Sequence, residues 1–250
     1  MAEQIIALAF VLIGATVLAI YGLRHRDTPL ETRDYPLFHA LSDEVGRVAE
    51  EGKAIHIALG KGGLASSDAL TSVAALQSLN ALFNLSAAYD APPLITTSDP
   101  TLFLLAGDWM RRAYARIGNA ARYRPLFVQF AAPTPTTYAA MAATYFFDGG
   151  LSSNIILGKF DQEVSLLTEA TQRRSIHSMG GTTSLEGISA LYPTLPSDEF
   201  AMGEDLFAGA AEVIQRSPYW ASLGAQDILR WLTIAGIVVA AILSVVYGGG

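Results

Sequence analysis

Short apolar runs alternate with amphipathic stretches along this chain. Five of the runs suit buried strands, and each is followed by a turn rich in Gly, Pro, Ser or Thr and then by a helical pattern. The runs occupy residues 54–59, 94–97, 126–131, 154–157 and 175–179. This alternation predicts an α/β fold with a doubly wound, mostly parallel sheet of about five strands, a Rossmann-like arrangement with helices on both faces.

Helical patterns fill the intervals between the predicted strands. They cover residues 37–51, 69–89, 100–117, 136–147, 161–173 and 198–215. The stretch 69–89 is unusual because it has no charged residue, and a helix of that kind is rarely left exposed to water. It could be a third membrane span, but its amides and hydroxyls make insertion costly, so packing on the sheet is favoured.

Three amide side chains of that helix share one stripe. Gln77, Asn80 and Asn84 are spaced i, i+3 and i+7. They could hydrogen-bond across a contact with the same chain or with a neighbouring copy and so fix its register. We take these three residues as candidates for an oligomer interface.

Two longer apolar segments lie near the ends of the chain. Residues 5–23 contain no charge, and their length is close to the roughly 20 residues that a helix needs to cross a bilayer. A cleaved signal peptide would begin with basic residues, which the first four positions lack, so an uncleaved anchor is favoured. The second segment covers residues 229–247.

Basic residues lie on the inner side of both segments. Arg24, Arg26 and Arg33 follow the first segment, whereas Arg216 and Arg230 precede the second. Because positive flanks stay in the cytoplasm, we expect both termini outside and the main domain inside. The predicted location is the cell membrane (inner or plasma membrane), crossed twice, with the lipid bilayer as a partner.

These patterns divide the chain into four parts. One transmembrane helix at each end flanks the sheet domain. The parts are a transmembrane anchor at 1–23, a linker at 24–36, a cytoplasmic α/β domain at 37–218, and a juxtamembrane segment with the second transmembrane helix at 219–250.

Composition narrows the chemistry that the chain can perform. The net charge of −7, with no Lys/Arg cluster strong enough to override it, argues against nucleic acid as a partner. The chain has no cysteine, which excludes disulfides, thiolate nucleophiles and cysteine-ligated metals. It also lacks H-E-x-x-H and G-x-S-x-G motifs, so we assign no catalytic residue and no metal ligand.

The turn after the first strand is the strongest candidate for a binding site. Gly60-x-Gly62-x-x-Ala65 fits a relaxed dinucleotide fingerprint, in which glycines let backbone amides approach a pyrophosphate. The ribose-binding acid expected about 20 residues on is missing at that spacing, and Asp99 ends the next strand 34 residues after Ala65. A tight strand-to-helix turn also requires glycine without any ligand.

A second turn follows the fifth predicted strand at residues 180–184, GGTTS. It could share a ligand with the first turn at the carboxyl edge of the sheet, although helix capping explains its hydroxyls equally well. The candidate cofactor-binding residues, for a nucleotide or another phosphate-bearing ligand, are Gly60, Lys61, Gly62, Gly63, Ser66, Gly180, Gly181 and Thr182.

Two histidines lie in predicted strands. His56 and His177 each follow an isoleucine. A histidine in a central strand is more often a buried, hydrogen-bonded core residue than a catalyst or a ligand, so we give neither a catalytic role.

The runs IHIALGKGG, LITTSDP and IHSMGGT, placed between two terminal apolar spans, also carry a resemblance. In this respect the chain is similar to an uncharacterised family of bacterial membrane proteins that is known only as a domain of unknown function. The resemblance covers most of residues 37–247. It implies no activity and supplies no functional residues.

Two functions are compatible with these patterns. The first is a membrane-anchored structural scaffold that forms a homo-oligomer, because the charge-free helix and the small residues of the end segments favour self-association. The alternative is a membrane-tethered binding domain or enzyme for a nucleotide or phosphate-bearing small molecule at the glycine turns. Whether the chain is an enzyme stays open, and the missing catalytic constellation argues against it.

Overall fold

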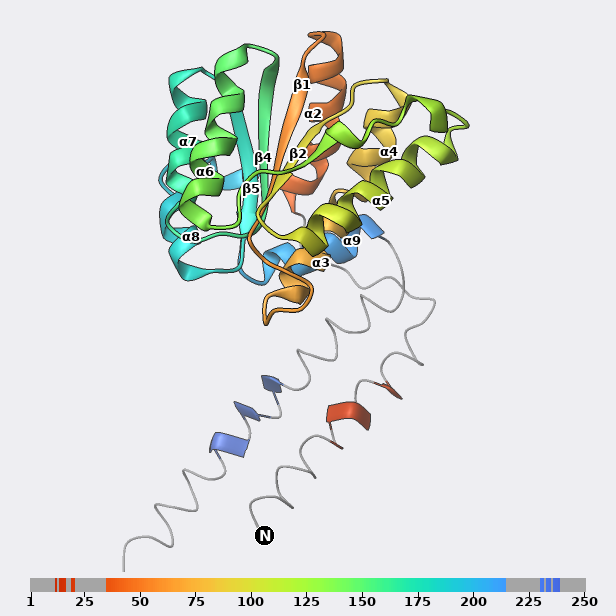
Figure 1. The fold of residues 1–250 in the computed structure, drawn as a ribbon. Coiled ribbons are helices and arrows are strands. Elements are labelled where there is room, and N and C mark those ends of the chain that lie inside the picture. Colours follow the sequence, from red (N-terminus) through yellow and green to blue (C-terminus); the bar gives the residue numbers. More distant parts are fainter. Residues whose placement is uncertain are drawn as a thin grey trace, which may run out of the picture. The chain divides into compact units, whose positions relative to one another are not determined.

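The computed structural model describes residues 12, 14–16, 19–20, 35–214, 230–231, 233–234 and 236–238. The chain divides into two units, of which Arg33–Ile214 is a folded α/β domain (Figure 1). The other unit combines the two ends of the chain, and its described residues are helical.

The two expected membrane spans, 5–23 and 229–247, lie mostly outside the described residues. None of the helices in the described part of the chain is both long and apolar enough to cross a bilayer.

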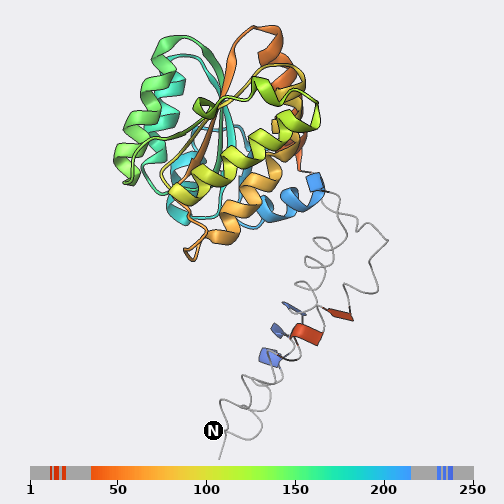
Figure 2. The same cartoon turned by 45° about the vertical axis from the view of Figure 1, so that its right-hand side comes forward.

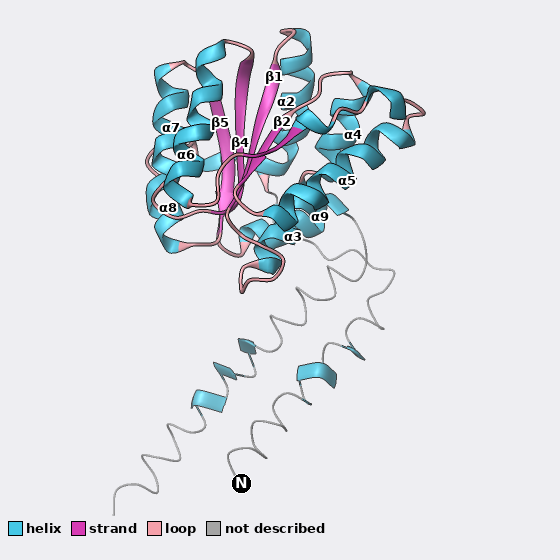
Figure 3. Cartoon of the chain, in the orientation of Figure 1, coloured by secondary structure: helices cyan, strands magenta, loops and turns pink. Residues whose placement is uncertain are grey.

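Six parallel strands form the sheet of the domain (Figure 3). They are β1 (Ala54–Gly60), β2 (Leu94–Thr97), β3 (Val128–Phe130), β4 (Leu151–Lys159), β5 (His177–Thr182) and β6 (Phe200–Met202). Their order across the sheet is β3-β2-β1-β4-β5-β6, which confirms the predicted α/β fold with a parallel, Rossmann-like sheet.

Helices cover both faces of this sheet. The α-helices are α2 (Pro36–Glu50), α3 (Ala69–Ser78), α4 (Asn80–Ala88), α5 (Pro100–Arg116), α6 (Pro135–Thr144), α7 (Val164–Arg173), α8 (Leu185–Leu191) and α9 (Asp205–Ile214). Short 3-10 turns are η1 (Ala120–Arg122), η2 (Pro125–Phe127), η3 (Tyr145–Asp148) and η4 (Ser197–Glu199). Figure 2 shows α3 to α5, in orange to yellow-green, grouped apart from α6, in green.

Two apolar cores lie between the sheet and its helices. Helices α2 to α5 and α9 bury one face, to which β1 contributes Ile57 and Leu59. Helices α6 to α8 bury the other face, to which β1 contributes Ala58 and β4 contributes Ile156. Because both faces of the central strands are covered, these strands are buried at nearly every position rather than at alternate ones.

Three details differ from the sequence-based expectation. The sheet gains β6, and the expected helix at 198–215 begins only at Asp205. The stretch 69–89 forms α3 and α4 with a break at Leu79 instead of one helix. The fifth strand extends to Thr182, so the residues predicted to open a turn at 180 lie inside β5.

Candidate functional site

The first glycine turn lies where the strand order reverses. β1 and β4 are neighbours at the centre of the sheet, and Gly60 at the end of β1 pairs with Lys159 at the end of β4. In open α/β sheets ligands bind in the crevice at this position, beside the carboxyl ends of the strands. The predicted site is therefore in the place that the fold favours for a ligand.

Packing within the domain accounts for the glycines at the start of this turn. Gly60 has φ of +67°, and a side chain there would overlap with the backbone oxygen of Lys159. A Cβ on Gly62 would overlap with Ser72 Oγ, which donates a hydrogen bond of 2.7 Å to the Gly62 carbonyl. Packing within the domain thus explains both glycines whether or not a ligand binds.

The carboxylate of Asp99 occupies the space beside Gly63. A Cβ on Gly63 would overlap with Asp99 Oδ2. The other oxygen, Oδ1, accepts hydrogen bonds from the backbone amides of Thr101 at 2.8 Å and Leu102 at 2.9 Å, and so caps α5. A carboxylate here would repel a phosphate brought to the Gly63 amide, but it could accept hydrogen bonds from sugar hydroxyls.

Asp99 did not fit the dinucleotide fingerprint because of its spacing from Ala65 along the chain. It lies just after β2, at the N-cap of α5, close to where dinucleotide-binding proteins carry their ribose-binding acid. It lies far from the glycine turn along the chain because two helices, α3 and α4, form the connection between β1 and β2. Its position directly after a strand was the signal that could have identified it.

The lysine of the first glycine turn is already paired with a carboxylate. Lys61 forms an ion pair with Asp161, and Lys159 Nζ lies 3.8 Å from the other carboxylate oxygen of Asp161. Burial lowers the pKa of Lys61, but the hydrogen bond to Asp161 and the charges of Glu163 and Asp68 outweigh this and raise it. One carboxylate thus holds both lysines, which reduces the positive charge available to an anion.

Hydroxyl groups connect the first turn to its surroundings. Ser66 Oγ donates a hydrogen bond of 2.7 Å to the carbonyl of Gly63, within the same turn. Thr71, in the first turn of α3, lies 3.0 Å from Thr183 through their Oγ1 atoms. The loop after β5 and the start of α3 are therefore brought together, as a ligand shared by the two turns would require.

The remaining candidates of the second turn are buried within the sheet. A side chain on Gly180 would overlap with the backbone of Ile156 in β4, and a Cβ on Gly181 would lie 2.5 Å from the carbonyl oxygen of Ala201 in β6. Thr182 is fully buried. These residues let three strands approach closely, so they do not line an open turn.

His56 is a neutral core residue. Its ring bonds to Asn154 Oδ1 at 2.7 Å and to Thr96 Oγ1 at 2.9 Å, and it contacts Phe146 edge to face. Burial lowers its pKa to about 4, although the bond to Asn154 opposes this. Tyr138 extends the chain of polar groups, with its hydroxyl 3.0 Å from Thr96 Oγ1.

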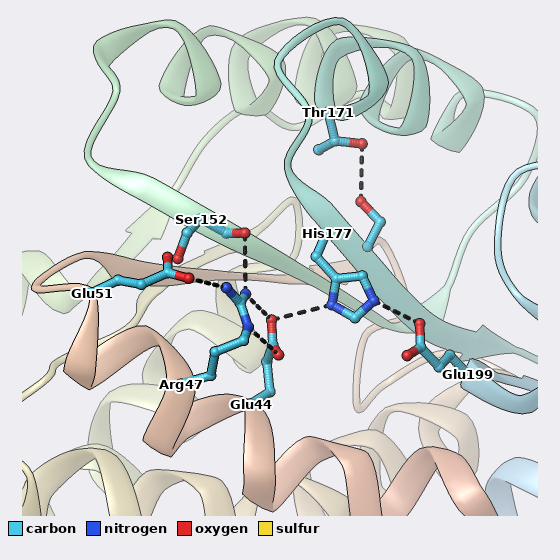
Figure 4. A network of polar contacts seen from close by, with 8 residues as sticks. Glu44, Arg47, Glu51, Ser152, Thr171, His177 and Glu199 are labelled. Carbon is cyan, nitrogen blue, oxygen red and sulfur yellow. Dashed lines mark hydrogen bonds and ion pairs between the residues drawn. The ribbon is translucent and has the colours of Figure 1, made fainter.

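His177 belongs to a different environment, at the amino edge of the sheet (Figure 4). Its Nδ1 lies 3.2 Å from Glu44 in α2, and its Nε2 lies 2.8 Å from Glu199 in η4. Arg47 binds Glu44 through two nitrogens, with Nε donating at 2.9 Å. Arg47 also pairs with Glu51.

This network links segments that are far apart in the sequence. Hydrogen bonds to Glu44, together with the charge of Glu199, raise the pKa of His177 although burial opposes this. Burial raises the pKa of Glu44, but hydrogen bonds from Arg47 and His177 outweigh it and hold that pKa at about 2. The Glu44–Arg47 pair is therefore charged at neutral pH, and the network fastens α2 to β5 and η4.

This network was not predicted from the sequence. Glu44 is only 5% exposed and lies on the apolar stripe of α2 with Leu41, Val45 and Val48. A carboxylate on a buried stripe requires a charged partner, and this was the signal available in the sequence.

Comparison with known proteins gives a family for this chain. The family described as "Domain of unknown function (DUF6754)" matches residues 1–249. The chain belongs to this family. No protein of curated function matches it, and no solved structure does.

In this member of the DUF6754 family, the charge-free segment is covered by its own chain. α3 contacts α9, whereas α4 contacts α2 and α5. Gln77, Asn80 and Asn84 are each partly exposed, and Asn84 Oδ1 accepts a hydrogen bond of 3.2 Å from Arg116. Packing within the domain explains the missing charges, and the role of the three amides in an oligomer stays a prediction.

Proposed function

We propose that this chain is a membrane-attached scaffold whose α/β domain assembles into a homo-oligomer. The segments 5–23 and 229–247 would anchor it as two transmembrane helices, with the domain in the cytoplasm and both termini outside. The proposal assigns the domain a structural role and no reaction.

The observation that carries this proposal is that the lysines at the carboxyl edge of the sheet are already paired within the domain. The groups best able to hold an anion there are bonded to one another, since Lys61 pairs with Asp161 and the Asp99 carboxylate lies beside Gly63. A phosphate would have to break the ion pair and approach a carboxylate. Packing within the domain is sufficient to explain the glycines.

Exposed apolar side chains support self-association. Leu185 at the start of α8 is 83% exposed, and Leu70 in α3 is 74% exposed. Leu104 in α5 is exposed to a similar degree. Side chains of this size are more favourable when a partner covers them, at about 1.5–3 kcal/mol for each one fully buried.

A nucleotide-binding function is the second candidate, and two features favour it. The strand order places the glycine turn at the switch point of the sheet, and Asp99 lies just after β2, close to where dinucleotide-binding proteins carry their ribose-binding acid. A thermal-stability screen of the full chain with ATP, NAD and inorganic phosphate tests it, with the variant Asp99→Asn as control. Stabilisation by a nucleotide that Asp99→Asn abolishes would favour this candidate over the scaffold.

One experiment tests the scaffold proposal directly. Membranes from cells expressing the full chain are washed with alkaline carbonate, extracted in mild detergent and examined by native mass spectrometry. We expect the chain to stay in the membrane pellet and to appear as a defined oligomer without added mass. Release by carbonate would refute the anchoring, and a monomer would refute the self-association. A retained mass of a few hundred daltons would favour the ligand-binding alternative.

A further inference from the structure

The two outer strands of the sheet have surroundings of opposite charge. β3 and β6 are the edge strands, and five strand spacings, or about 24 Å, separate them. Figure 1 shows α5, which packs on β2 and β3, on one side of the domain and α8 on the other.

The surroundings of β3 are basic. Residues 109–147 contain no Asp or Glu, and their five arginines are all exposed. These arginines are Arg111, Arg112, Arg116, Arg122 and Arg124. Asp108 pairs with two of them and Asp90 with one, which leaves three net positive charges. We call this surface the basic edge.

The surroundings of β6 are acidic. Residues 175–205 contain no Lys or Arg but five carboxylates: Glu186, Asp198, Glu199, Glu204 and Asp205. Glu199 is bound to His177, and Asp198 is exposed in η4. We call this surface the acidic edge.

Both edges also present apolar side chains between their charges. Leu126, directly before β3, is 74% exposed, and Phe130 at the end of β3 is partly exposed. On the acidic edge, Met202 is 40% exposed at the end of β6. A hollow of about 100 Å³ lies beside β6, with Phe38 and Phe200 in its wall and Asp198 in its lining.

We propose that the basic edge of one copy docks on the acidic edge of the next. A second copy of this chain is the partner that carries both the complementary charge and the complementary apolar surface. Leu126 of one copy would enter the hollow of the next copy, and Arg124 would pair with the carboxylates that line the hollow. The inference rests on the proposed self-association and adds the surfaces that carry it.

This contact joins two different surfaces of the chain. It is therefore head-to-tail and does not produce a symmetric dimer. The copies form either a closed ring, in which every edge is occupied, or a filament with one free edge at each end. Because both edges are solvent-exposed and charged, the contact should weaken as salt concentration rises.

Charge exchange tests the contact. Arg124→Asp and Asp198→Arg each place like charges across it, whereas a chain with both substitutions restores opposite charges. Neither side chain is bonded to another described side chain, so both variants should fold, which circular dichroism verifies. Lys53→Asp, an equal change of charge in the turn between α2 and β1, is the matched control.

Native mass spectrometry of the full chain in mild detergent at low salt supplies the readout. We expect each single variant to weaken assembly by about tenfold or more, the double variant to restore it, and Lys53→Asp to leave it unchanged. Assembly that survives both single variants would overturn the edge-to-edge contact while leaving self-association intact. Loss with Arg124→Asp but not with Asp198→Arg would also overturn it, because the partner of the basic edge would then be another acidic molecule. A monomeric wild type would refute the proposed self-association itself.

Discussion

Removing the charge of Glu44 should weaken the domain in a manner that depends on pH. The carboxylate is 5% exposed and is held by Arg47 and His177. Its pKa falls from the ordinary 4.5 to about 2, and this difference corresponds to about 3 kcal/mol of stability. Because the folded pKa is the lower one, this stability is complete above pH 4.5 and disappears as the pH falls towards 2.

The variant Glu44→Gln isolates this contribution because glutamine has the shape of the protonated acid. We expect it to unfold more easily than the wild type by about 3 kcal/mol at pH 7, and the difference should shrink towards zero near pH 2. Glu50→Gln, in an exposed position of the same helix, is the control and should change stability by less than about 0.5 kcal/mol.

Urea unfolding at several pH values measures the difference. Trp109 packs against the core of the domain and serves as the fluorescent reporter when Trp220 and Trp231 are replaced by Phe in every variant. Parallel stability curves for the wild type and Glu44→Gln between pH 7 and pH 3 would refute the reasoning, because the charge of Glu44 would then contribute nothing.

Three further predictions concern single residues. Gly60→Ala should destabilise the domain by about 3 kcal/mol, because a left-handed conformation costs about 1 kcal/mol and overlap with a backbone oxygen adds to this cost. The control is Gly118→Ala, which has a similar φ but open space around it. It should cost only about 1 kcal/mol in the same urea assay. The ring of His177 should titrate above pH 6.5 in an NMR experiment, and its pKa should return towards 6.5 in Glu44→Gln. The stability that protonated His177 adds is complete below pH 6.5 and is lost as the pH rises through its folded pKa. His56 should stay neutral down to about pH 4 in the same spectra, and protonation near pH 6.5 would contradict its burial.

The apolar pattern predicted the central strands well and the edge of the sheet poorly. The runs around Ile57 and Ile156 are buried on both faces, so burial imposes a continuous apolar signal that the sequence displays. β6 has only three residues, Phe200–Met202, and its pairing with β5 decides its conformation. A strand that short leaves no periodic signal in the sequence.

Residues at the candidate sites show a second limit of sequence reasoning. The glycines at 180 and 181 suggested a turn, but they allow close approach of neighbouring strands, and sequence alone does not separate these two uses. The partners of His177 lie 133 and 22 residues away, so only the folded chain brings them together. Lys61 follows β1 directly, but its ion-pair partner Asp161 lies in the loop after β4, 100 residues later.

The close contact between the first and last helices of the domain has a mechanical consequence. Phe38 in α2 packs directly on Gly209 in α9, where any larger side chain would overlap with its ring. Tension applied to the two ends of the domain would therefore pull on α2 and α9 first, whereas the hydrogen bonds of the sheet lie deeper in the chain. Under load the domain should lose these two helices before its central strands separate.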